Sequence, residues 1–260
     1  MRSSMIDIPP PRGNRWPRLP FNGAPLGVLM MERMGSENRP FIPGDTGNAS
    51  TWTVPARYKV VPGLSVSRIF APDAGEMLST VVEAAKELAR EGAQLITCQC
   101  GYSIQYQAAV RDAVDVPVFL SSLLLAPFLE RMLPRGKALG IMVASKSVLT
   151  PDMLEAAGLP ASLGRRVAIV GLEDTPAFAE SWIRSVGRLD VKAVEKDVVD
   201  TAVALVNDRL DIGMLLLECG DLPPYAASVQ SATGLPVFDY TSMVEFFIGG
   251  LVRKPFTGLI

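Results

Sequence analysis

The sequence predicts an α/β fold with mostly parallel sheets, and three observations support this prediction. Short, strongly apolar segments alternate with amphipathic segments along most of the chain. The apolar segments are continuous hydrophobic runs, which are typical of strands that are buried on both faces. The amphipathic segments between them have the length and spacing of helices that connect parallel strands.

The individual elements follow from local patterns. Residues 74–91 are predicted to form a helix because hydrophobic residues recur at intervals of three and four, with Asp73 before them as a cap. Further helices are predicted at 104–114, 123–133, 191–209, 223–232 and from residue 242 onward. Strands are predicted at 23–31, 66–70, 93–98, 116–120, 138–144, 167–172, 212–219 and 235–240.

The chain has 260 residues, which exceeds the length of a typical single domain, so two lobes are expected. We expect an N-terminal extension at 1–22, a first lobe formed by 23–122 together with 239–260, and a second lobe formed by 123–238. The first 20 residues hold five prolines and four arginines and lack the continuous apolar stretch of a secretory signal.

Composition argues against several classes of partner. The 25 basic and 27 acidic residues nearly cancel, so neither nucleic acid nor an anionic membrane is an expected partner. No apolar run has the length of about 18 residues that a membrane-spanning helix needs. Three cysteines, an odd number, fit a reducing compartment better than a disulfide framework. A soluble, cytoplasmic protein is therefore expected.

The chain contains no histidine. This absence excludes Ser-His-Asp and Cys-His catalysis and removes the usual zinc-ligand sets, so no metal site is expected. Proton transfer in an active site must then use Cys, Asp, Glu, Lys, Tyr or water.

An internal repeat indicates where such a site lies. Residues 100–119 align without a gap with residues 219–238, and nine of the 20 positions are identical. Each copy consists of Cys-Gly at the end of an apolar strand, a helix and a second strand. Ligands of open α/β sheets bind beyond the carboxyl ends of the strands, where each copy places its cysteine.

The paired placement favours a catalytic role for Cys100 and Cys219 over the usual role of a buried cysteine as a small hydrophobe. The N-terminus of the next helix can favour a thiolate. If the two lobes face each other, the two thiols meet across one cleft, where one can remove an α-proton and the other can donate from the opposite face. Cys98 aligns with Leu217 and is expected in the core.

The two cysteine segments, ITCQCGYS and LLLECGDLPPY, resemble the paired motifs of the aspartate/glutamate racemase superfamily. The stretches GVLMMER, IPGDTGNASTW and VPVFLSSLL are also similar to an amino-acid racemase-like subgroup. The resemblance covers the chain from about Gly23 onward. It implies two pseudo-symmetric Rossmann-like lobes with the active site in the cleft between them, no cofactor, and a homodimer.

The motifs also depart from those of glutamate racemases. Those enzymes carry Asn-Thr after the first cysteine, where this chain has Gly101 and Tyr102. They carry Thr-His after the second cysteine, where this chain has Gly220 and Asp221. Their Asp-Ser-Gly after the first strand is absent as well. Glutamate is therefore not the expected substrate.

The carboxylate of a substrate needs hydrogen-bond donors at the ends of strands. The resemblance points to backbone N–H groups and small hydroxyls there, and the long loop between the first two predicted strands has the length of a binding loop. The candidate substrate-binding residues are Asn48, Thr51, Gly101, Ser121, Ser122, Ala144, Ser145, Gly220 and Asp221. Glu218 precedes Cys219 in its strand, so its side chain is expected to point to the other face and to be structural.

The resemblance and the cysteine pair together predict a cofactor-independent racemase or epimerase. It would act at the carbon α to the carboxylate of a small amino acid or a related acid, by thiolate/thiol proton transfer. Two alternatives stay within the superfamily, an arylmalonate-type decarboxylase and a maleate-type cis-trans isomerase. A third is a non-catalytic protein that binds a small carboxylate.

Overall fold

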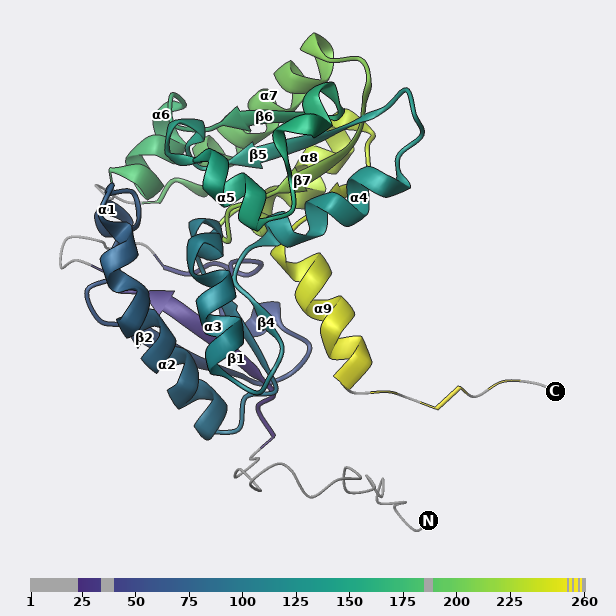
Figure 1. Ribbon diagram of the computed structural model, residues 1–260. Helices are drawn as coiled ribbons and strands as arrows, with labels where there is room; N and C mark the ends of the chain where they lie inside the picture. Colours follow the sequence, from purple (N-terminus) through teal and green to yellow (C-terminus); the bar gives the residue numbers. More distant parts are fainter. Residues whose placement is uncertain are drawn as a thin grey trace.

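The computed structural model describes residues 23–33, 40–184, 189–251, 253, 255, 256 and 258. These residues form two four-stranded sheets in which every strand pair is parallel. Helices flank the sheets, and the two sheets lie in separate lobes (Figure 1). The predicted α/β class with two parallel-sheet lobes is confirmed, whereas the extension predicted at 1–22 lies outside the described residues.

The sheet of the first lobe has the order β2-β1-β3-β4. Its strands are β1 (Leu26–Met31), β2 (Ala56–Val61), β3 (Leu95–Cys98) and β4 (Val118–Phe119). The α-helices are α1 (Val66–Ile69), α2 (Leu78–Arg90) and α3 (Gln107–Ala113), and the 3-10 helices are η1 (Ala49–Thr51), η2 (Ala74–Met77) and η3 (Gly101–Tyr106). Every residue of β1 is buried, as its continuous apolar run predicts.

The sheet of the second lobe has the equivalent order β6-β5-β7-β8. Its strands are β5 (Ala138–Val143), β6 (Val167–Gly171), β7 (Ile212–Leu217) and β8 (Val237–Phe238). The α-helices are α4 (Ala126–Met132), α5 (Pro151–Ala156), α6 (Pro176–Phe178), α7 (Val191–Asp208) and α8 (Ala226–Thr233). The short helices are η4 (Ser122–Leu125), η5 (Lys146–Val148), η6 (Ala161–Arg166), the π-helical η7 (Ala179–Ile183) and η8 (Pro223–Tyr225).

The last helix returns to the first lobe. In α9 (Tyr240–Leu251), the side chains of Tyr240, Val244 and Ile248 pack with residues of β1 in one hydrophobic cluster. The hydroxyl of Tyr240 donates to the backbone oxygen of Leu120, 2.8 Å away. The C-terminal segment therefore completes the core of the lobe that the N-terminal segment begins (Figure 1). The exact domain boundaries stay a prediction.

The prediction of a second strand at 66–70 is wrong. Residues Val66–Ile69 form the short helix α1, because the Ser65 side chain accepts the backbone N–H of Arg68 and so caps a helical turn. β1 pairs with both β2 and β3, and β2 overlaps the end of the long loop predicted after the first strand. Asp73 makes no capping bond and instead forms an ion pair with Arg68.

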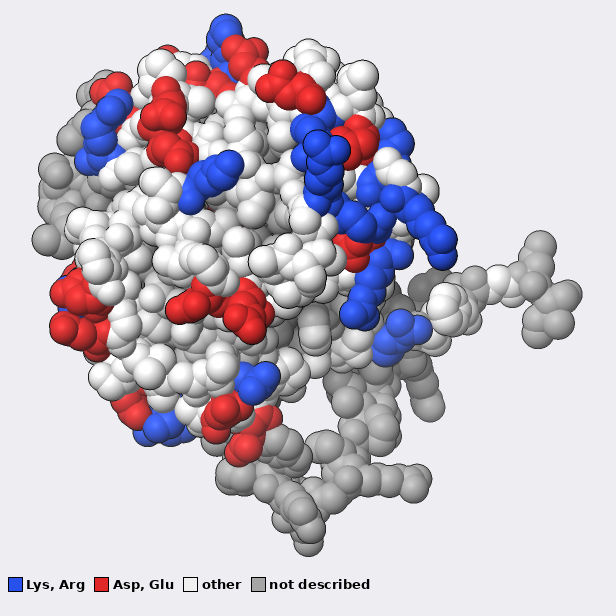
Figure 2. All heavy atoms as spheres, turned by 45° about the horizontal axis from the view of Figure 1, so that its top comes forward, with Lys and Arg blue, Asp and Glu red and all other residues white. Residues whose placement is uncertain are grey.

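The surface shows no membrane-spanning element and a mixed charge distribution. Within the described residues, no helix has both the length and the apolar character that crossing a bilayer requires. On the face shown in Figure 2, acidic and basic side chains are interspersed, apart from a group of lysines and arginines toward one side. This mixture agrees with a net charge of −2.

Candidate active site

The repeat places the two motif cysteines at equivalent positions. Cys100 lies two residues after the end of β3, and Cys219 lies two residues after the end of β7. The two strands occupy the same place in their sheets. Both cysteines line one cavity between the lobes, together with Met31, Val66, Ile69, Phe70, Tyr102, Ala144, Trp182, Ile183 and Asp221.

This inner cavity is small in the structure. Its volume is about 20 Å³, which is room for about one water molecule. Ile69 and Phe70, at the end of α1, cover it from the first lobe, and Trp182 and Ile183 of η7 cover it from the second. A substrate larger than a water molecule therefore does not fit beside the cysteines unless the walls of this cavity move.

Burial governs the ionisation of the two thiols. It raises the pKa of Cys100 and of Cys219 well above the ordinary value, and the nearby carboxylates of Glu218 and Asp221 raise both pKa values further. The backbone N–H groups of Tyr102 and Asp221 act in the opposite direction, on Cys100 and Cys219 respectively. The backbone N–H groups after each cysteine thus lower the thiol pKa as expected, but burial outweighs them, so the neutral thiol is favoured at both cysteines.

The side chain of Glu218 does not line the inner cavity but lies beside the first Cys-Gly motif. It is fully buried, and burial raises its pKa to about 8, against which the N–H of Ala144 acts. Its carboxyl group fills the space beside the α-carbon of Gly101, where an added Cβ would lie 1.8 Å from Oε1. The sequence could not indicate this placement because Glu218 and Gly101 belong to different lobes.

The two Cys-Gly motifs pack against each other at their glycines. A Cβ on Gly220 would lie 2.0 Å from the backbone oxygen of Gln99, just as a Cβ on Gly101 would meet Glu218. Any larger residue at these positions would collide with the opposite motif. Gly101 and Gly220 therefore let the lobes approach closely enough for the cysteines to share a cavity. The substrate-binding roles expected of these two glycines stay a prediction.

Asp221 lies beside the second cysteine and faces the cavity. Its Oδ2 is 3.8 Å from Sγ of Cys219, and its Oδ1 accepts a hydrogen bond of 3.4 Å from the Gln99 amide. Glu218 aligns with Gln99 and Asp221 aligns with Tyr102 in the internal repeat. The pseudo-symmetric site therefore carries different polar groups beside each cysteine.

Aromatic side chains form much of the remaining wall. Phe70 and Tyr102 meet edge to face with ring centroids 5.1 Å apart. The Tyr102 hydroxyl donates to the backbone oxygen of Ser145 and accepts from the backbone N–H of Ser145, at 2.6 and 2.7 Å. Trp182 adds a third ring from η7. Sequence reasoning missed these three residues, because no local pattern separates them from ordinary core aromatics.

Comparison with known proteins fits this arrangement. A family model described as AroM protein matches residues 57–133. The chain is 30% identical over 243 residues to the dimethylsulfoniopropionate lyase of Durusdinium sp. clade D, which covers 91% of this chain and 78% of that protein. It is also 30% identical over 244 residues to dimethylsulfoniopropionate lyase 7 of Emiliania huxleyi (strain CCMP1516), covering 90% and 69%.

Solved structures share the fold at low sequence identity. The allantoin racemase of Pseudomonas fluorescens has a TM-score of 0.58 at 15% identity, covering 87% of this chain and 91% of that one. The glutamate racemase of Bacillus anthracis has a TM-score of 0.55 at 15% sequence identity, and the match covers 88% of this chain and 82% of that one. Unliganded arylmalonate decarboxylase has a TM-score of 0.52 at 17% sequence identity, and the match covers 90% of this chain and 97% of that one. The chain therefore has the two-lobed fold of the aspartate/glutamate racemases and of arylmalonate decarboxylase. By its sequence, the chain belongs to the same family as the dimethylsulfoniopropionate lyases.

The predicted loop residues Asn48 and Thr51 form hydrogen bonds within the loop itself. The Asn48 amide donates to the backbone oxygen of Phe41, and its oxygen accepts from Ser50. The Thr51 hydroxyl donates to the backbone oxygen of Asp45. Neither Asn48 nor Thr51 lines the inner cavity. The loop reaches the site through its backbone instead, since the N–H of Thr46 donates to the oxygen of Gly220.

The predicted serines are placed around the site rather than in it. Ser121 caps η4 by accepting the N–H of Leu123. The Ser122 hydroxyl donates to the backbone oxygens of Leu217 and Glu218, which ties η4 to the second motif. Ser145 contacts the site through its backbone bonds to Tyr102, whereas Ala144 lines the cavity directly. Substrate-binding roles for these residues stay a prediction.

Cys98 lies in the core, as expected. Its side chain is fully buried at the end of β3, 3.1 Å from the Ser103 hydroxyl, and it does not line the cavity. The three cysteines are free thiols. Within the described ranges, no group of three or more Cys, Asp or Glu side chains is arranged to hold a metal ion.

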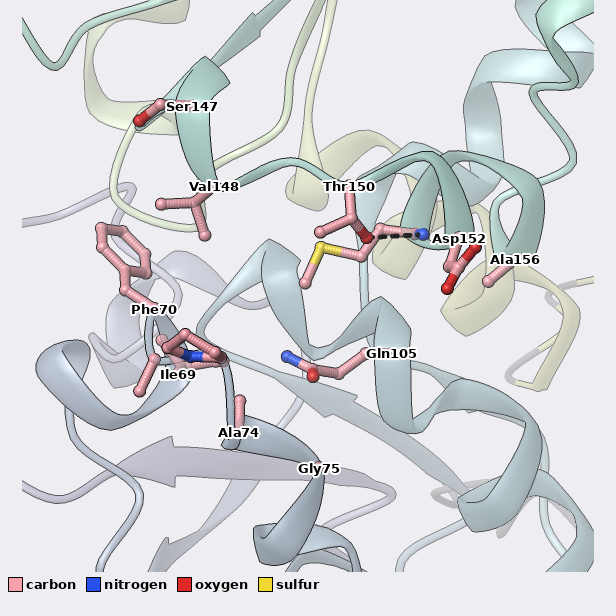
Figure 3. A pocket seen from close by; sticks show the side chains of 13 residues that line it. Ile69, Phe70, Ala74, Gly75, Gln105, Ser147, Val148, Thr150, Asp152 and Ala156 are labelled. Atoms are coloured by element: carbon pink, nitrogen blue, oxygen red, sulfur yellow. Dashed lines mark hydrogen bonds between the residues drawn. The ribbon is translucent and has the colours of Figure 1, made fainter.

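A larger pocket lies on the outer side of the cavity wall. It has a volume of about 580 Å³ and lies between η2 and η3 of the first lobe and η5 and α5 of the second (Figure 3). Ile69 and Phe70 line both this outer pocket and the inner cavity. These two residues are therefore the partition between a pocket large enough for a small acid and the buried thiols.

Proposed function

We propose that this protein is a lyase that eliminates a cationic sulfur group from the β-carbon of a small carboxylate, with dimethylsulfoniopropionate as the substrate type. The observation that carries the proposal is the composition of the inner cavity. It combines two thiols with the rings of Phe70, Tyr102 and Trp182 and the carboxylate of Asp221. The activity of the 30% identical relatives supports the same reaction. Sequence reasoning alone did not anticipate elimination.

A cationic substrate suits this cavity. Aromatic faces attract sulfonium and quaternary ammonium groups, and a carboxylate adds a direct charge attraction. None of the described residues that line the cavity is a lysine or an arginine. The substrate carboxylate is then held by backbone N–H groups at the starts of the helices that follow the strands.

The reaction is balanced without a co-reactant. A thiolate at Cys100 takes the proton from the carbon next to the carboxylate. The electron pair of that C–H bond forms the carbon–carbon double bond, and the carbon–sulfur bond breaks with its pair on sulfur. The products are a neutral sulfide, an unsaturated acid and one proton, which leaves Cys100 for water. We assign the base to Cys100 because Asp221, which attracts the cation, lies beside Cys219.

Two inhibitors of equal shape test whether the charge of Asp221 attracts a cationic group. 3-(Trimethylammonio)propionate and 4,4-dimethylpentanoate differ in one atom, nitrogen against carbon, and hence in charge. We expect the cation to inhibit at least about tenfold more tightly, and Asp221→Asn to remove most of that difference, about 1.4 kcal/mol. Competition against turnover measures both inhibition constants.

The matched control for Asp221 is Asp112→Asn, which changes an exposed carboxylate paired with Arg111. It should leave the ratio of the two inhibition constants unchanged. Equal inhibition by the two compounds in the unaltered protein would contradict a cation-selective cavity.

The outer pocket is proposed as the route by which substrate reaches the thiols. Gly75 lines it, and a Cβ at Gly75 would have no atom within 4 Å, so a tryptophan can fill the pocket without a clash at its base. We expect Gly75→Trp to lower kcat/KM on the order of tenfold while changing kcat little, since it hinders access and not chemistry. Steady-state kinetics measure both constants.

Gly136→Trp is the control for this substitution, because a Cβ at Gly136 also meets no atom within 4 Å and Gly136 does not line the pocket. The two variants should have similar thermal stability but different kcat/KM. Equal kcat/KM would mean that substrate enters elsewhere.

Racemisation is the second candidate, and the meeting of Cys100 and Cys219 in one cavity favours it. Two thiols on opposite sides of one carbon are the arrangement that a two-base racemase needs. Loss of the α-proton NMR signal in D₂O, followed across chiral amino acids, hydroxy acids and hydantoins, tests it. Exchange without elimination would favour this candidate. A homodimer acting in the cytoplasm remains part of the proposal.

A further inference from the structure

Glu218 is a buried acid that neither proposed reaction uses. Its side chain is fully buried, and among the described residues no lysine or arginine forms an ion pair with it. Its backbone is fixed on both sides, by a 2.8 Å bond from its N–H to Met142 and by the Ser122 hydroxyl, which donates to its oxygen. The carboxyl group is thereby held at Gly101, the residue that follows Cys100.

Three of the groups whose pKa responds to Glu218, namely Cys100, Tyr102 and Cys219, line the cavity, and the fourth, Tyr240, lies in the core of the first lobe. The negative charge of Glu218 raises the pKa of Cys100, Tyr102, Cys219 and Tyr240. For Cys100 it is the largest charge effect, ahead of those of Cys98 and Asp221. At the equivalent place beside Cys219 the repeat carries Gln99, an amide that cannot accept a proton. Of the two aligned residues, Gln99 and Glu218, the ionisable one is therefore the one beside the motif of Cys100.

We propose that Glu218 is the proton acceptor that generates the Cys100 thiolate. This inference rests on the proposed function in one respect, that Cys100 is the base. Because Glu218 acts through Cys100 and does not touch the substrate, it is a positioning and proton-transfer residue.

Cys100 and Glu218 together hold the same number of protons at the start and at the end of one turnover. The thiol of Cys100 gives its proton to the Glu218 carboxylate, which leaves a thiolate and a neutral carboxylic acid. The thiolate then takes the α-proton of the substrate. One of the two protons now held by the pair is released to water with the products, and the other returns the pair to a thiol and a carboxylate.

Ionisation of Glu218 fits this role. A carboxylate in water, with a pKa near 4.3, is too weak a base to deprotonate a buried thiol efficiently. Burial raises the pKa of Glu218 to about 8, which brings it closer to that of a thiol. The unsubstituted protein should therefore gain activity as the pH rises through about 8, because the carboxylate is the form that accepts a proton.

A purely electrostatic role predicts the opposite result. If Glu218 were only a nearby negative charge, replacing it with glutamine would lower the pKa of Cys100 and raise the thiolate fraction. Turnover at pH 9, where the Glu218 carboxylate carries its charge, would then rise. If Glu218 accepts the proton, the same substitution removes the acceptor, and turnover falls although the thiol has become more acidic.

The experiment compares Glu218→Gln, Glu218→Asp and the control Glu130→Gln in the full-length chain. Glutamine already stands at the equivalent position of the repeat, so the amide is compatible with this packing. Glu130 is also buried but pairs with Arg166 in the second lobe, away from the cavity. Elimination of dimethylsulfoniopropionate is measured from pH 5 to 10, together with iodoacetamide labelling of the Cys100 peptide by mass spectrometry.

We expect Glu218→Gln to lower kcat at pH 9 at least tenfold, to abolish the rise of kcat near pH 8, and to move Cys100 labelling to lower pH. Glu218→Asp should restore part of the rate, and Glu130→Gln should keep the pH profile. Unchanged or faster turnover by folded Glu218→Gln would overturn the proposal, as would no recovery in Glu218→Asp. Full turnover by Cys100→Ala would instead refute the proposed function, so the two failures are distinguishable.

Discussion

Replacement of Cys100 by alanine is expected to reduce elimination from dimethylsulfoniopropionate by about 10²- to 10⁴-fold, the usual contribution of a positioned acid or base. The substitution would remove the proposed base from a cavity of about 20 Å³. Cys219→Ala should cost about tenfold or less, because the neutral sulfide leaves without needing a proton. Gas chromatography of the released sulfide measures both rates.

The same two variants separate elimination from racemisation. A two-base racemase loses inversion in both variants to a similar extent, because each thiol serves one face of the substrate. Cys98→Ala is the control, since Cys98 lies in the core and does not line the cavity. Normal sulfide release by Cys100→Ala would exclude Cys100 as the base. Equal losses in the Cys100 and Cys219 variants would shift the assignment to a two-thiol mechanism.

The second large expected effect concerns stability and its dependence on pH. Glu218 has a raised pKa in the folded protein, about 8 against 4.5 for the ordinary group. A raised folded-state pKa means that the contribution of this group to stability is complete below pH 4.5 and is lost as the pH rises through 8. The free energy of unfolding should therefore fall by up to about 1.4 kcal/mol per pH unit within this window.

Glu218→Gln should remove this loss, because an amide carries no charge to bury. We expect the variant to be more stable than the unsubstituted protein at pH 8, by a few kcal/mol, and similar to it near pH 5. The buried thiols titrate above this window, since burial raises their pKa values above 9. Urea unfolding at pH 5, 6.5 and 8 measures the difference.

A stability difference that stays constant across these pH values would contradict a titrating Glu218. Glu130→Gln serves again as the control. It changes a buried carboxylate that is paired with Arg166, and it should show no such trend between pH 5 and 8. Greater stability together with lower activity in Glu218→Gln would identify Glu218 as a residue kept for function at a cost to folding.

The sequence by itself determined the fold class and the cysteine pair. Continuous apolar runs predict parallel strands, because such strands are covered on both faces and leave no polar alternation. The gapless repeat located Cys100 and Cys219, because each copy is a local unit of strand, Cys-Gly, helix and strand. The equivalent positions of β3 and β7 in their sheets then follow from topology.

Only the tertiary structure decided which side chains surround the thiols. Glu218 reaches Gly101, and Tyr102 reaches Ser145, across the interface between the lobes. Trp182 enters the cavity from η7. Asn48 and Thr51 look like ligand-binding residues in the sequence, yet their side chains are used inside their own loop. Hydrophobic periodicity records which face of an element is buried, but it does not record which residue of the other lobe that face meets.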